Sequence, residues 1–84
     1  MISVAVQFAA SAFKHHYTET DIHHVLLHPV YDEIQDKGGD KHLLIGFDRN
    51  MNLVEIVYNI IDEQVYKVFH ADKCQKRHLA LLKR

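Results

Sequence analysis

Beyond Pro29 the hydrophobic pattern changes from the period of a helix to the period of strands, and this change constrains the fold more than any other feature. Apolar residues alternate with polar ones, or cluster as β-branched runs, through 30–36, 41–47, 53–61 and 65–70. Successive side chains of a strand point to opposite faces of a sheet, so each segment is predicted to be a strand. The connections 37–40, 48–52 and 62–64 are short, and the first two contain the Gly, Asp and Asn residues typical of turns. Sequential strands joined in this way are expected to be antiparallel neighbours.

The residues before Pro29 predict one short strand and two short helices. Residues 4–8 alternate like a strand, and 9–16 have the spacing of a short helical stretch. Thr18 is a suitable N-cap for a second helix, and Asp21 stands three residues later, as in a capping box. Pro29 is expected to end this helix near His28.

These expectations combine into one α+β domain over residues 1–84. An N-terminal strand and two short helices pack on a three- to four-stranded antiparallel meander sheet, and a C-terminal helix begins at Asp72 or Lys73. Cys74 is the only cysteine, which excludes an intrachain disulfide and fits a reducing compartment. The apolar N-terminus lacks the basic segment of a signal peptide, and no apolar run is long enough to span a bilayer. We therefore expect a cytoplasmic protein without membrane contact.

The net charge of −1 hides a strong asymmetry along the chain. Residues 1–66 contain four Lys/Arg and ten Asp/Glu, whereas residues 67–84 contain six Lys/Arg and one Asp. A cationic C-terminal segment of this kind favours contact with nucleic acid or with an acidic protein, and a solvated terminal helix is the alternative explanation.

Eight histidines allow two kinds of chemistry. His24 and His28 are four residues apart on a predicted helix, so they share a face and could bind one metal ion, with Asp21 as a further ligand. The other possibility is general acid–base chemistry, because histidine titrates near neutrality. His70 follows the last predicted strand, close to the basic segment, and a hydrogen-bonded structural position at the sheet edge is its alternative role.

Cations that could accompany His70 come from three places in the chain. Lys73 and Arg77 follow it in the basic segment, Lys14 and His15 end the first helical stretch, and Lys41 begins a strand. Cleavage of RNA by attack of the 2′-hydroxyl needs an ionisable group beside the reacting oxygens and cations around the phosphate. The sequence thus contains the residue types that a metal-free ribonuclease requires.

Several segments, taken in order, resemble the BrnT-like toxins of the RelE superfamily. The similarity includes the opening "F…S…KH" motif, the acidic start of the second helix, the His-Pro that ends it, and three strand segments. These lie at 8–15, 18–22, 28–29, 43–48, 52–57 and 68–71. Two positions depart from the family pattern: His16 stands where a glycine usually follows the KH motif, and Asp72-Lys73 stands where an arginine is common.

The resemblance implies a RelE-like fold and a metal-independent endoribonuclease toxin that inhibits translation without a cofactor. Its partners would be a cognate antitoxin protein and RNA, including ribosome-bound mRNA, and a homo-oligomer is compatible with the size of the domain. The catalytic residues that the resemblance points to are Lys14, His15, Lys41, His70, Lys73 and Arg77. Two other functions stay open: a non-catalytic protein-interaction module of the same fold, and a histidine-rich metal-binding domain.

Overall fold

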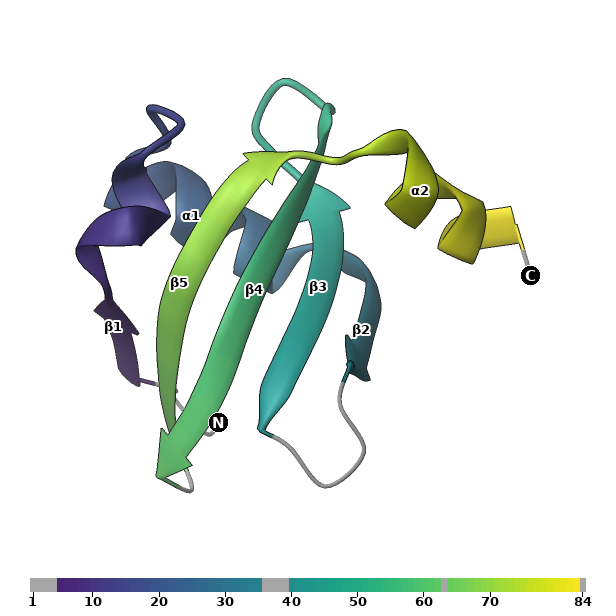
Figure 1. Ribbon diagram of the computed structural model, residues 1–84. Helices are drawn as coiled ribbons and strands as arrows, with labels where there is room; N and C mark the ends of the chain where they lie inside the picture. The colour runs from purple at the N-terminus through teal and green to yellow at the C-terminus, as the bar shows by residue number, and fades with distance from the viewer. Residues whose placement is uncertain (1–4, 36–39, 63, 84) are drawn as a thin grey trace.

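The computed structural model describes residues 5–35, 40–62 and 64–83 and shows an α+β domain (Figure 1). Within these ranges, four short helical segments flank a single sheet. In chain order the elements are β1 (Ala5–Phe8), the 3₁₀-helix η1 (Ala10–Phe13), α1 (Glu19–Leu27), β2 (Pro29–Ile34), β3 (Lys41–Phe47), β4 (Leu53–Asp62), β5 (Val65–Lys73), α2 (Lys76–Leu79) and the 3₁₀-helix η2 (Ala80–Lys83).

In the part of the chain that the structure describes, the sheet has five strands in the order β1-β5-β4-β3-β2. Strands β2 to β5 form the expected antiparallel meander. The N-terminal strand does not stand apart from this meander, because β1 pairs in parallel with β5 over the register Ala5↔Val65 to Phe8↔Val68. The sheet is therefore five-stranded and mixed, which corrects the expected three- to four-stranded antiparallel sheet. Parallel pairing requires a crossover connection, and the chain from β1 to β5 runs through the helices and the whole meander.

Helix α1 begins and ends as its sequence predicts. The Thr18 side chain accepts a hydrogen bond from the backbone N–H of Asp21, and the Asp21 carboxylate accepts one from the backbone N–H of Thr18. This capping box supplies acceptors for two N–H groups that have no partner within the helix. His28 is the C-cap, directly before Pro29. The preceding segment is less regular than expected: only Ala10–Phe13 is helical, as a 3₁₀ turn.

The main core lies between the sheet and the layer formed by η1 and α1. Strand Gly46 lies under α1, where an added Cβ would be 2.6 Å from the carbonyl oxygen of Val25 and 2.7 Å from that of His28. Glycine thus permits the close packing of α1 on β3. The buried residues of this core are Ala12, Ile22, Val25, Leu44, Val54, Ile56, Tyr58, Val68 and Ala71.

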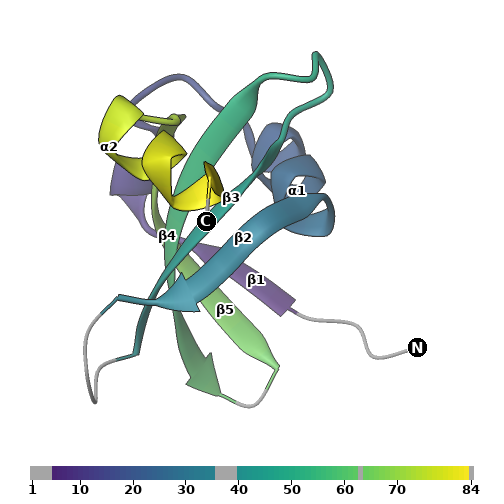
Figure 2. The same cartoon turned by 90° about the vertical axis from the view of Figure 1, so that its right-hand side faces the viewer.

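The C-terminal segment lies on the opposite side of the sheet, as Figure 2 shows for α2 relative to α1. We expected a helix from Asp72 or Lys73, but β5 continues to Lys73 and α2 begins only at Lys76. Asp72 and Lys73 pair with Glu55 and Val54 of β4, so the backbone bonds of the sheet outweigh the local helical preference of these residues. The helical part is also short, because α2 ends at Leu79 and η2 continues to Lys83.

The turn expected at 48–52 is present, and the Asp48 carboxylate accepts hydrogen bonds from the backbone N–H groups of Asn50 and Asn52. Most of the turn expected at 37–40 lies outside the described residues. Among the described helices, none has the length and apolar character needed to cross a membrane.

Candidate active site

Glu55 in the middle of β4 is the centre of the candidate site. Val54 and Ile56 on either side of it point into the core, so Glu55 points to the opposite face of the sheet, the one that carries α2. Its side chain is only 2% exposed. Removing a carboxylate from water is costly unless hydrogen-bond donors replace the lost hydration.

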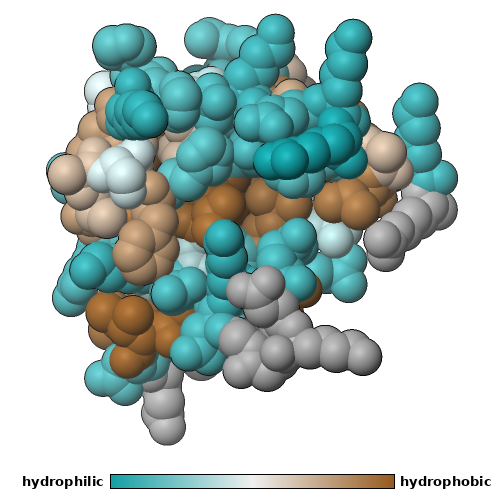
Figure 3. Space-filling view, in the orientation of Figure 1, coloured by the Kyte–Doolittle hydropathy of each residue, from teal (hydrophilic) through white to brown (hydrophobic). Residues whose placement is uncertain are grey.

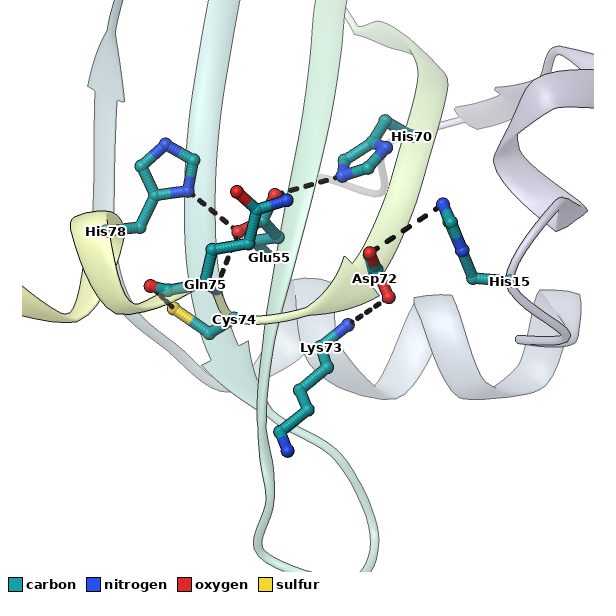
Figure 4. Close-up of polar contacts among 8 residues, drawn as sticks. All are labelled: His15, Glu55, His70, Asp72, Lys73, Cys74, Gln75 and His78. Carbon is teal, nitrogen blue, oxygen red and sulfur yellow. Dashed lines mark hydrogen bonds and ion pairs between the residues drawn. The ribbon is translucent and has the colours of Figure 1, made fainter.

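Three donors from two parts of the chain surround the Glu55 carboxylate (Figure 4). The Nε2 atom of His70 on β5 lies 2.9 Å from Glu55 Oε2. The Nδ1 atom of His78 on α2 lies 2.7 Å from Glu55 Oε1, and the backbone N–H of Gln75 donates to the same oxygen at 3.0 Å. Because Gln75 is the N-cap residue of α2, this hydrogen bond also fixes the start of the helix against the sheet.

The balance of burial and hydrogen bonding determines the charge of Glu55. Burial alone would raise the pKa of this carboxyl group, but the hydrogen bonds from Gln75, His78 and His70 outweigh it and lower the pKa below its ordinary value. Glu55 is therefore an ionised carboxylate at neutral pH and can only accept hydrogen bonds. Each imidazole must donate an N–H to it.

This requirement determines which ring nitrogens are left for chemistry. His70 uses Nε2 toward Glu55, so its Nδ1 is the nitrogen that can exchange a proton with a ligand; for His78 the free nitrogen is Nε2. The side chains of His70 and His78 are 30% and 18% exposed, so both rings reach solvent while Glu55 does not. The arrangement is one buried carboxylate that orients two accessible imidazoles.

The three side chains line a hollow of about 430 Å³ on the α2 face of the sheet. Two cationic residues, Lys41 from the start of β3 and Arg77 from α2, line the same hollow. Its apolar part is formed by Leu43, Val57 and Phe69. Figure 3, which views this side of the molecule, shows hydrophobic surface across the middle with hydrophilic groups above and below. A ligand with an anionic group and a flat apolar part would fit this combination.

His15 reaches the edge of this cluster from the other end of the chain. Its ring contacts the His70 ring edge-to-face, with centroids 5.7 Å apart, and its Nε2 lies 3.7 Å from Oδ2 of Asp72. The tight turn after η1 brings it there, and the next residue, His16, has a φ of 72°. A positive φ favours glycine, so the side chain of His16 is held in a backbone conformation that is unfavourable for it.

Four of the six sequence-predicted site residues are gathered here and two are not. Lys41, His70 and Arg77 line the hollow, and His15 contacts His70. Lys14 is exposed and does not line the hollow. The Lys73 side chain runs away from Glu55 in Figure 4 and lines a different hollow beside Tyr17.

Two central residues, Glu55 and His78, were not predicted from the sequence. Glu55 interrupts a strand that is otherwise apolar, Leu53-Val-Glu-Ile-Val-Tyr58, and a lone carboxylate in such a strand was a usable signal. His78 could not be placed, because the expected long helix gave no information about which of its faces would meet the sheet.

The His24–His28 pair does not have the arrangement of the metal site that its spacing allowed. Both Nδ1 atoms are within hydrogen-bond distance of backbone carbonyl oxygens, His24 with Phe47 at 3.0 Å and His28 with His24 at 2.7 Å. The two rings stack with centroids 4.2 Å apart. The Asp21 carboxylate already accepts hydrogen bonds from the backbone N–H of Thr18 and from the Arg49 guanidinium. In the described ranges, no three His, Cys, Asp or Glu side chains are grouped so that they could hold a metal ion.

Comparison with known proteins adds no relative: no family model, no curated protein and no solved structure matches this chain.

Proposed function

We propose that this protein is a metal-independent endoribonuclease and acts as the toxin of a type II toxin–antitoxin pair. The observation that carries the proposal is the buried Glu55 carboxylate that orients His70 and His78 inside a hollow flanked by Lys41 and Arg77. The ordered motifs shared with BrnT-like toxins support it, and so does the positive φ of His16 where that family usually has glycine.

The chemistry needs two proton carriers and a cationic surface. One neutral imidazole removes the proton from the ribose 2′-hydroxyl, and the 2′-oxygen attacks the adjacent phosphorus. The bond from phosphorus to the 5′-oxygen breaks, and the second imidazole, protonated, donates its proton to that oxygen. The products are a 2′,3′-cyclic phosphate and a free 5′-hydroxyl. Lys41 and Arg77 would stabilise the additional negative charge on the phosphate during the transfer.

Glu55 takes no proton in this scheme and acts as a positioning residue. As an ionised acceptor it keeps each ring in the tautomer whose free nitrogen is the one not bonded to Glu55, and it stabilises whichever ring carries the positive charge. His15 contacts the His70 ring and Asp72, which places a third imidazole beside the pair.

The test is cleavage of a synthetic RNA by the purified chain in the presence of EDTA, with the product ends identified by mass spectrometry. We expect 2′,3′-cyclic phosphate and 5′-hydroxyl ends, and a loss of rate of about 10²–10⁴-fold in both His70→Ala and His78→Ala. His23→Gln is the matched control, because His23 is exposed on α1, on the other side of the sheet. Intact RNA after incubation with folded protein would contradict the proposal.

A cellular experiment tests the toxin part separately. Expression of the chain in a bacterium should arrest growth and shorten mRNA, and His70→Ala should remove both effects. Co-expression of the reading frame next to its gene should restore growth if that frame encodes the antitoxin. Normal growth and intact mRNA with folded protein would favour the non-catalytic interaction module, in which the Glu55 network only stabilises the fold.

A further inference from the structure

A second hollow adjoins the candidate active site on the same face of the sheet. It has a volume of about 450 Å³ and is lined by Asp40, Lys41, Val57, Asn59 and Phe69. Lys41, Val57 and Phe69 also line the hollow that holds His70 and His78. The two hollows are therefore neighbours with a shared wall, and a ligand bound at the imidazoles would extend into the second one.

Phe69 forms the aromatic part of this wall. The residue lies in an irregularity of β5, between the pairs Val57↔His70 and Tyr58↔Val68, where it has no partner on β4. The Ser11 hydroxyl donates to the Phe69 carbonyl oxygen at 2.6 Å, which anchors the backbone on the η1 side. The ring is thus held one residue before the His70 imidazole.

The Phe69 ring lies at the surface and is not part of the core. It is half-buried and does not belong to the hydrophobic cluster between the sheet and α1. The ammonium group of Lys67 lies over this ring, 5.6 Å from its centroid, and Lys67 is not among the residues that line either hollow. An aromatic ring with an apolar neighbour, Val57, and an accessible side is a suitable surface for stacking a planar group.

The far end of the second hollow is polar. In the orientation that satisfies its hydrogen bonds, the amide nitrogen of Asn59 donates to the backbone carbonyl oxygens of Tyr58 at 3.3 Å and Asp40 at 3.2 Å. The amide oxygen of Asn59 is then an acceptor, and its two lone pairs allow more than one hydrogen bond. Every nucleobase has an N–H or amino group on its Watson–Crick edge, so such an acceptor suits a base whose edge is not paired.

We propose that the second hollow binds one unpaired nucleobase next to the scissile phosphate, with the base stacked on Phe69 and its edge toward Asn59. This inference rests on the proposed ribonuclease function and adds its substrate class, which is single-stranded RNA. Lys41 lines both hollows and would contact the phosphate between them. In a duplex both faces of each base are stacked and the edges are paired, so duplex RNA would not enter.

The test measures binding apart from cleavage. A fluorescent single-stranded 2′-O-methyl RNA has no 2′-hydroxyl to react, so its Kd can be measured by anisotropy for the wild type and variants whatever the activity. We expect Phe69→Ala to raise Kd about 5- to 150-fold, which corresponds to one lost base stack. Phe69→Trp should bind like the wild type, and the same strand annealed to its complement should bind the wild type more weakly.

Phe13→Leu is the matched control, because its ring is 37% exposed and belongs to η1, away from both hollows. Circular dichroism confirms that each variant is folded. An unchanged Kd for Phe69→Ala, or equal affinity for single strand and duplex, would overturn the inference. If the protein does not cleave RNA but its binding still depends on Phe69, the proposed ribonuclease function is refuted and the base-binding site is supported. If the protein cleaves RNA but Phe69→Ala does not change binding, the base-binding site is refuted and the ribonuclease function is supported.

Discussion

Replacing Glu55 by Gln should separate the role of the carboxylate in stability from its role in orienting the imidazoles. The amide oxygen can still accept from the Gln75 N–H and from His78. The amide NH₂ group would then face Nε2 of His70, which must become an acceptor, so the proton of this ring moves to Nδ1. The network keeps three hydrogen bonds but loses its charge, and His70 changes its tautomer.

The expected loss of stability is small and the expected loss of catalytic rate is large. A hydrogen bond to a charged group contributes about 1.5–3 kcal/mol, and a neutral one contributes about 1 kcal/mol. Glu55→Gln weakens three such bonds, and two of them are to partly hydrated rings. We therefore expect the free energy of unfolding to fall by about 2 kcal/mol. Catalysis should fall much further, by about 10³–10⁴-fold, because the wrong tautomer of His70 has no free nitrogen toward the substrate. Glu55→Ala leaves buried donors unpaired and should cost about 3–5 kcal/mol.

Urea unfolding followed by circular dichroism at pH 7 gives the free energies, and the RNA cleavage assay gives the rates. Glu33→Gln is the matched control, since Glu33 is an exposed strand carboxylate on β2, and it should stay within about 0.5 kcal/mol of the wild type. If Glu55→Gln were as stable as Glu33→Gln, or if it cleaved RNA at the wild-type rate, the reasoning would be wrong.

Four further predictions concern stability and reactivity. Gly46→Ala should destabilise the protein by about 1–3 kcal/mol in urea unfolding, because its Cβ would meet two backbone carbonyl oxygens of the helix region above it. His16→Gly should stabilise it by about 0.5–1 kcal/mol, since the position has a φ of 72°; a loss of stability would show that the side chain makes contacts that matter more. Because the pKa of Glu55 is lowered in the folded state, the unfolded chain takes up a proton below pH 4.5 before the folded chain does. The free energy of unfolding of the wild type should therefore fall more steeply than that of Glu55→Gln as the pH decreases below 4.5. Equal slopes for the two proteins would contradict this. Burial raises the pKa of the Cys74 thiol, followed by the effect of nearby Glu55, so a thiol reagent should label the native protein far more slowly than the urea-unfolded chain.

Local sequence signals predicted the elements that depend on local physics. The Thr18–Asp21 capping box and Pro29 set the limits of α1, and period-two alternation gave the bounds of β3 as Lys41–Phe47. These features need only neighbouring residues, because a cap, a proline and the alternation of a strand act within a few positions.

The features that depend on distant pairing could not be derived in this way. The parallel pairing of β1 with β5 joins residues about 60 positions apart, and nothing in Ala5–Phe8 specifies this partner. The extension of β5 to Lys73 depends on β4 in the same manner. The candidate site has the same origin, because Glu55, His70 and His78 come from three elements whose faces meet only in the folded chain.

The pH dependence of single-turnover RNA cleavage is the most direct test of the central claim that Glu55 holds His70 and His78 as an acid–base pair. The pair works only when one ring is neutral and the other protonated, so the rate should have a bell-shaped dependence on pH, and each of His70→Ala and His78→Ala should remove one limb of the bell. A rate that rises steadily with pH, or a profile that keeps both limbs in the two variants, would contradict the account.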